Sequence, residues 1–192
     1  TGYHAATQIV RQAFGIFDSD PPAVARDKLD EGVARLVPAA ESADTARYIG
    51  LLLGLGTGIP GVNQRLVFLA MRRMIECLGN EQPTLVVFED IHWAAPSELD
   101  LIEYLAAQLR QAAVVIVVLT RPELLDERPW GARLPAHTSI VLDPLSAPET
   151  RELAQGLVDD ASGSGEIVDR LVAVSEGNPL FIEELSAALA DG

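Results

Sequence analysis

One short stretch constrains the fold of this chain more than any other, an apolar run that ends in two acids. Residues Thr84–Phe88 read TLVVF without a polar interruption, and Glu89 and Asp90 follow directly. A run of this kind predicts a β-strand that is buried on both faces, as in a parallel sheet. Acids that follow such a strand lie at the edge of the sheet where open α/β folds bind ligands. Their oxygens suit a hard cation such as Mg2+, or a water that attacks a phosphate.

Two further apolar runs follow in the sequence. Val114–Leu119 predicts a second buried strand, and a helix that opens at Pro96 separates it from the first. Strand, helix and strand in this order predict a βαβ unit with parallel strands. Thr138–Leu142 predicts a third, shorter strand. We therefore expect an α/β fold, with a parallel sheet and helices on both of its faces.

The segments before and after these strands have apolar residues at helical spacing. This spacing predicts four helices before the first strand, over about 5–17, up to about 37, from about 44, and over about 62–78. Ser146 and Glu149 form a capping-box pattern, and the chain beyond them has the spacing of helices only. We expect two domains, an α/β core over 1–145 and a helical lid over 146–192.

Charge and cysteine content exclude several classes of protein. The 28 acidic and 14 basic residues give a formal net charge of −14. A chain this acidic lacks the basic face that nucleic acid or an anionic membrane surface requires. Cys77 is the only cysteine, so no internal disulfide can form, and a reducing compartment, the cytoplasm, is the simplest inference. No apolar run approaches the ~18 residues of a membrane span, and the chain starts as though cut from a larger protein.

Three charged residues are the main candidates for chemistry. Glu89 and Asp90 point to opposite faces of an extended strand, so one is expected near a metal ion and the other near an attacking water. Arg121 follows the second apolar run and would lie at the same edge. Its guanidinium could hold a terminal phosphate. The alternative for Arg121 is an ion pair with Glu123 or Glu89.

Other motifs allow two interpretations each. His92 and Trp93 lie just past the acids, where a histidine could titrate near neutral pH or simply pack in a loop. Asn178 and Pro179 fit the cap and first turn of a helix. Residues Gly56–Gly61 match the G-x-G-x-x-G of dinucleotide-binding folds, but the segment before them has helical spacing, which favours a loop between helices.

Several catalytic classes have no support in the sequence. A phosphate-gripping G-x-x-x-x-G-K-[ST] loop needs a lysine after glycine, and Lys28, the only lysine, has no glycine beside it. No serine or cysteine lies in the context of a nucleophilic triad, and no Cys/His cluster has metal-ligand spacing.

Three motifs together resemble one protein family. Residues 85–97 (LVVFEDIHWAAPS) closely resemble the Walker B segment of AAA-like, STAND-type P-loop ATPase modules. Such modules occur in bacterial adenylate or guanylate cyclases and in large LuxR-type transcriptional regulators. Residues 115–123 (VIVVLTRPE) look like the family's sensor strand with its arginine, and residues 174–185 (VSEGNPLFIEEL) look like its lid motif.

The resemblance implies a partial P-loop NTPase sheet of order 5-1-4-3-2, which lacks the strand and Walker A loop that open such modules. It implies that Glu89 and Asp90 serve Mg2+ and water, that Arg121 meets the γ-phosphate, and that Asn178 and Pro179 lie near the base. The cofactors of the intact parent would be ATP and Mg2+.

The implied role is an ATP-driven switch for an effector domain in the same chain, with this segment alone almost inactive. The sheet edge left open by the missing strand would favour homo-oligomers through residues 114–119, or insertion of residues 138–142. The alternative function is an α/β interaction scaffold whose acids are vestigial.

Overall fold

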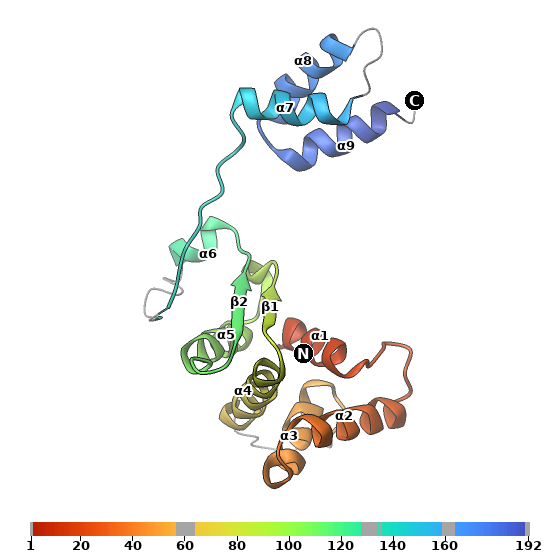
Figure 1. The fold of residues 1–192 in the computed structure, drawn as a ribbon, viewed down its shortest axis with the longest axis vertical. Helices are drawn as coiled ribbons and strands as arrows, with labels where there is room; N and C mark the ends of the chain where they lie inside the picture. Colours follow the sequence, from red (N-terminus) through yellow and green to blue (C-terminus); the bar gives the residue numbers. More distant parts are fainter. Residues whose placement is uncertain (1, 57–63, 128–133, 135, 159–163, 191–192) are drawn as a thin grey trace. The chain divides into compact units, whose positions relative to one another are not determined.

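The chain folds into two compact units, which are described separately (Figure 1). The computed structural model describes residues 2–56, 64–127, 134, 136–158 and 164–190. The first unit spans Thr1–His137 and the second spans Thr138–Gly192. Helices account for most of the described residues in both units. None of the helices in these ranges combines the length and the apolarity that crossing a bilayer requires.

The first unit begins with four helices, and the sequence predicts all four. They are α1 (His4–Phe14), α2 (Pro22–Leu36), α3 (Ala39–Leu52) and α4 (Gln64–Glu81). Gly15 ends α1 in a left-handed conformation with φ of 61°, where glycine is favoured. Pro38 separates α2 from α3, and α3 begins directly after it, earlier than the expected position near residue 44. The aliphatic face of α4 is buried against the other helices.

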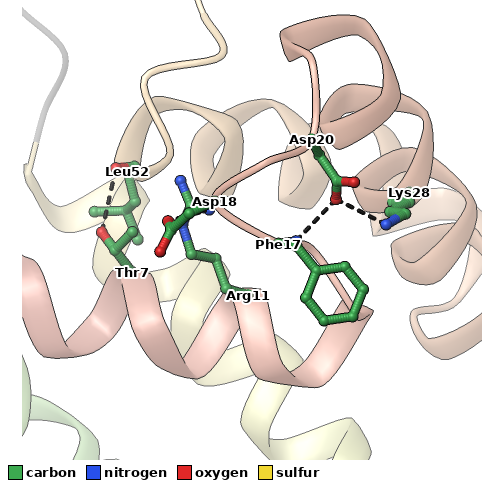
Figure 2. Close-up of polar contacts among 7 residues, drawn as sticks. All are labelled: Thr7, Arg11, Phe17, Asp18, Asp20, Lys28 and Leu52. Carbon is green, nitrogen blue, oxygen red and sulfur yellow. Dashed lines mark hydrogen bonds and ion pairs between the residues drawn. The ribbon is translucent and has the colours of Figure 1, made fainter.

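The turn between α1 and α2 is held by a cluster of charged side chains (Figure 2). The Asp20 carboxylate accepts hydrogen bonds from Lys28 Nζ at 2.7 Å and from the Phe17 backbone N–H at 2.8 Å. Lys28 Nζ also lies 4.8 Å from the centroid of the Phe17 ring. Arg11 pairs with Asp18 at 2.9 Å. The Lys28 bond, then the Phe17 bond, lowers the pKa of Asp20 below its usual value.

Two parallel strands follow the four helices. Strands β1 (Thr84–Phe88) and β2 (Val114–Val118) pair in register, with Thr84 opposite Val114 and Phe88 opposite Val118. Between them lie a short 3-10 turn, η1 (Ile91–Trp93), and the helix α5 (Pro96–Gln108). The predicted strand, helix and strand unit is therefore confirmed. A short helix that the sequence analysis missed, α6 (Pro122–Glu127), follows β2.

The predicted fold class is wrong. In the described part of the chain the sheet has two strands only, and the molecule is mainly helical instead of a P-loop NTPase-like α/β fold. Residues 138–142 form no strand, so the predicted third strand is wrong. The side chains of Ile140, Val141 and Leu142 are 74–86% exposed. An apolar pentapeptide becomes a strand only when a neighbouring edge takes up its backbone hydrogen bonds, and here no edge does.

The sheet is buried on one face only, which corrects the expectation that both faces would be covered. Val86 and Phe88 of β1 point into the core. Leu85 and Val115, which are register partners on the opposite face, are 62% and 61% exposed. At Val114, the first residue of β2, the strand lies so close to Gly79 of α4 that a Cβ on Gly79 would collide with the Val114 side chain.

The start of α1 is tied to α5 across the first unit. Glu98, in the first turn of α5, is 3% exposed, and its carboxylate accepts a hydrogen bond from the Ala6 backbone N–H at 3.0 Å. Tyr3, the residue before α1, provides no side-chain cap. Ser97 Oγ adds a bond of 3.0 Å to the Gly2 carbonyl. A negative group at the amino end of a helix satisfies a free N–H and interacts well with the helix dipole.

The second unit contains three helices among its described residues. They are α7 (Ala147–Leu157), α8 (Ser164–Ser175) and α9 (Pro179–Ala190), as expected from the sequence. The unit has its own core, made of Ala154, Val168, Leu171 and Ile182.

Two local features hold the second unit together. The predicted capping box is present, since the Glu149 carboxylate accepts the Ser146 backbone N–H at 2.8 Å. Gly177 has φ of 79° in the turn before α9, and its carbonyl accepts the Leu145 N–H at 2.8 Å. A Cβ on Gly177 would collide with the carbonyl oxygen of Leu145.

Candidate functional site

The segments that follow β1 and β2 meet at one edge of the sheet, which we call the carboxyl edge (residues 89–93 and 119–121). Because β1 and β2 are parallel, the segments that follow them leave the sheet at the same end. The Leu119 N–H donates to the Phe88 carbonyl at 2.8 Å, and the Ile91 N–H donates to the Leu119 carbonyl at 3.2 Å. These two bonds join the loops just past the strands. The predicted site residues of the first unit therefore belong to one locality.

Glu89 and Asp90 lie at the carboxyl edge with their carboxylates exposed. Asp90 adopts a left-handed backbone conformation, with φ of 52° and ψ of 36°, which is uncommon for a residue other than glycine. Within the described part of the chain, Glu89 makes no hydrogen bond or ion pair. The Asp90 carboxylate has one neighbouring imidazole, that of His92, whose Nε2 lies 4.0 Å from Oδ1. Both acids are therefore available to a ligand.

His92 and Trp93 differ sharply in exposure although they are adjacent in the η1 turn. The His92 side chain is 10% exposed, and neither ring nitrogen has a hydrogen-bond partner among the described residues. Trp93 is 77% exposed. The two ring centroids are 5.1 Å apart. The loop-packing interpretation thus accounts for the burial of His92 but leaves its nitrogens unexplained.

Arg121 reaches this cluster from the loop after β2. Its Cζ lies 6.0 Å from the centroid of the Trp93 ring, a loose cation–π contact. Its side chain is exposed, and the ion pairs with Glu89 or Glu123 considered from the sequence are absent among the described residues. A guanidinium without a carboxylate partner can bind an incoming anion such as a phosphate.

The carboxyl edge provides too few ligands for a metal ion by itself. No group of three or more His, Cys, Asp or Glu side chains that could hold a metal occurs in the ranges that the structure describes. Glu89 and Asp90 supply carboxylate oxygens only, so Mg2+ would need further oxygens from water and from a bound phosphate. This is the usual situation of Mg2+ in phosphoryl-transfer sites.

Asn178 and Pro179 belong to the second unit, where the capping interpretation explains their contacts. Pro179 is the first residue of α9. Asn178 Oδ1 accepts the Leu180 N–H at 3.0 Å, and the Asn178 carbonyl accepts the Ile182 N–H at 3.3 Å. All of these contacts lie within the second unit. A role beside a nucleotide base stays a prediction.

The remaining sequence candidates contribute little. Residues 57–61 of the G-x-G-x-x-G match lie outside the described residues, and the helix α3, rather than a strand, comes before them. Burial, followed by the nearby Glu76 carboxylate, raises the pKa of the Cys77 thiol, which keeps it in the unreactive protonated form. The feature that sequence analysis missed is the unsatisfied burial of His92. No pattern in the sequence signals it, because the turn that buries the ring depends on packing.

Comparisons with known proteins give limited information. No family model matches the chain, and no solved structure matches it. An uncharacterized protein of Rhizobium meliloti (strain 1021) is 32% identical over 125 residues, which cover 60% of this chain. The chain spans only 11% of the length of that relative, which is therefore a much longer protein.

Proposed function

We propose that this chain supplies one side of a nucleotide site in a longer regulatory protein that uses ATP and Mg2+ as a switch. Glu89 and Asp90 would meet Mg2+ and the attacking water, and Arg121 would meet the γ-phosphate. The longer protein would be a STAND-type ATPase of the cytoplasm that controls a cyclase or transcription-regulator domain in the same chain. The proposal concerns the chemistry of the carboxyl edge and does not depend on an NTPase-like sheet.

One observation carries this proposal. Two carboxylates and one guanidinium follow two strands that leave a sheet at the same edge, and all three side chains are exposed. Among the described residues none of the three forms an ion pair with a side chain of Arg, Lys, Asp or Glu; Asp90 has only His92 at 4.0 Å, and Arg121 has only the Trp93 ring. Unpaired charges of both signs in one locality are suited to a ligand that carries both charges itself. A complex of Mg2+ with a triphosphate has this character.

The proposed chemistry assigns one step to each group. One carboxylate would hold Mg2+, and the cation would supply positive charge to neutralise the phosphate. The other orients a water for attack on the γ-phosphorus, and the products are ADP and inorganic phosphate. The Arg121 guanidinium stabilises the charge that develops on the transferred group. The ordering of loops by the γ-phosphate and their release after hydrolysis would be the switch.

Titration of the chain with a fluorescent ATP analogue in the presence of Mg2+ tests the proposal. We expect weak saturable binding, in the millimolar range, because the sequence has no Gly-Lys-Ser or Gly-Lys-Thr loop to grip the phosphates. Asp90→Asn and Arg121→Ala should each weaken it further. Arg110→Ala, which removes an exposed arginine elsewhere, is the matched control. An affinity for the ATP analogue that is unchanged by Asp90→Asn and Arg121→Ala would contradict the proposal. Micromolar affinity would contradict the expectation that binding is weak without a phosphate-binding loop.

The open face of the sheet favours a second candidate function, that of a non-catalytic interaction scaffold. Leu85, Val87, Val115 and Val117 form an exposed apolar face on two paired strands. Exposed apolar patches of this kind often mark contacts between proteins, including homo-oligomers. Replacing both Glu89 and Asp90 in the longer protein separates the candidates. Unchanged ATPase activity and signalling would favour the scaffold.

A further inference from the structure

His92 is the least satisfied polar side chain at the carboxyl edge. It is about nine-tenths buried, and neither of its ring nitrogens has a hydrogen-bond partner among the described residues. Buried polar groups in proteins nearly always find a partner, because an unmade hydrogen bond leaves the cost of dehydration uncompensated. An imidazole held in this state is therefore expected to gain a partner in another state of the protein.

The Asp90 carboxylate lies close to the His92 ring without bonding to it. His92 Nε2 lies 4.0 Å from Asp90 Oδ1, which is beyond hydrogen-bond distance. A movement of the Asp90 side chain by about 1 Å would close this gap to a normal bond length. The Asp90 carboxylate is exposed and its backbone is in the sparsely populated left-handed region. Residues held in such conformations are concentrated at ligand sites.

We propose that His92 is a positioning residue for Asp90, an inference that rests on the proposed nucleotide function. With the Mg2+–nucleotide complex bound, the Nε2–H of His92 would donate to a carboxylate oxygen of Asp90, the residue proposed to serve the cation. The bond fixes the orientation of Asp90 and gives Nε2, one of the two unpartnered ring nitrogens, a hydrogen-bond acceptor. Carboxylates that bind metals are commonly held in this way by a neighbouring hydrogen-bond donor.

The contacts of the ring support this assignment over simple packing. The His92 ring is in tilted contact with the Trp93 ring, and His92 lies in the turn that Asp90 opens, so its position is set independently of a ligand. A ring that serves packing alone could be replaced by phenylalanine without loss. A ring that serves as a donor could be replaced only by a side chain that keeps an N–H near the position of Nε2, and glutamine is the closest match.

NMR titration tests the proposal, since it measures weak binding and reports on the ring directly. The 15N-labelled chain is titrated with Mg2+ and a non-hydrolysable ATP analogue, and the His92 ring nitrogens are followed. We expect the Nε2 resonance to move as the site saturates. His92→Phe should weaken Mg2+-dependent binding by about 10-fold, as for other supporting groups. His92→Gln should restore most of the affinity, and His92→Phe should add little to Asp90→Asn.

Two results would overturn the proposal and are distinguishable. If Asp90→Asn weakens binding but His92→Phe does not, or if the Nε2 resonance is unmoved at saturation, the role of His92 is wrong and the nucleotide site stands. If no saturable binding occurs, or if Asp90→Asn has no effect on it, the nucleotide site itself is wrong and the role of His92 falls with it. The resonance is observed in the unsubstituted chain, so the test does not depend on the folding of a variant.

Discussion

Two charged regions of the first unit differ in how their side chains are satisfied. At the turn between α1 and α2, Asp20 is bonded by Lys28 and by the Phe17 backbone (Figure 2). At the carboxyl edge, Glu89 has no partner among the described residues. Neither region has a glycine-rich loop or a metal cluster to distinguish it. The comparison teaches that the pairing of charges, rather than their number, separates a structural cluster from a candidate site.

Among the described acids that accept a hydrogen bond, Glu98 is the most deeply buried. Its removal should have the largest effect on stability. Glu98→Ala leaves the Ala6 N–H without its acceptor and opens a gap beside α1. We expect the free energy of unfolding to fall by about 1–3 kcal/mol. Urea denaturation followed by circular dichroism measures this change. Glu98→Gln keeps an acceptor oxygen and is the control. An equal loss in both variants would show that charge, not the hydrogen bond, stabilises α1.

Asp20 provides a smaller effect with a defined dependence on pH. Because its pKa is lowered in the folded protein, its contribution to stability is present above the pKa of an unfolded aspartate. It is lost as the pH falls through the lowered folded value. Asp20→Asn should therefore lower the melting temperature at pH 7, and the two proteins should converge in acid. Asp18→Asn, which removes an exposed partner of Arg11, should change little at any pH. A constant difference between Asp20→Asn and wild type across pH would contradict this account.

The acids of the carboxyl edge should show the smallest effects on stability. Glu89→Gln and Asp90→Asn remove exposed charges that make no hydrogen bond from their side chains in the described part of the chain. The one neighbouring imidazole, that of His92, is 4.0 Å from Asp90. We expect each to change the free energy of unfolding by less than about 0.5 kcal/mol. Asparagine also tolerates the left-handed backbone of residue 90, so no new strain arises. Thermal unfolding measures both variants. A loss comparable to that of Asp20→Asn at pH 7 would remove the contrast between the two regions.

The local parts of the fold could be predicted from the sequence. The apolar run at Thr84–Phe88, the proline that opens α5 and the Ser146–Glu149 capping box each depend on residues close together in the chain. Such signals act through neighbouring backbone groups, so they are visible in the sequence. The order of strand, helix and strand followed from them and is confirmed.

The parts that depend on distant residues could not be predicted. Residues 138–142 have the composition of a strand, but a strand also needs a partner edge, which the sequence does not reveal. The Glu98 contact with Ala6 joins residues 92 positions apart. The burial of His92 and the left-handed backbone of Asp90 arise from the packing of one turn. The candidate residues themselves stay a prediction from the sequence, while their environment could be described only from the structure.

The contact between Gly177 and Leu145 has a practical consequence for anyone who wishes to produce the second unit by itself. The chain enters this unit through Leu145, which is bonded to the Gly177 carbonyl, and Pro144 also packs beside that glycine. A gene fragment that begins after Leu145 would lose the hydrogen bond and the packing contact to Gly177, although every helix of the unit would remain. A gene fragment that begins upstream of Pro144 keeps Pro144, Leu145 and Gly177 together, and with them both contacts.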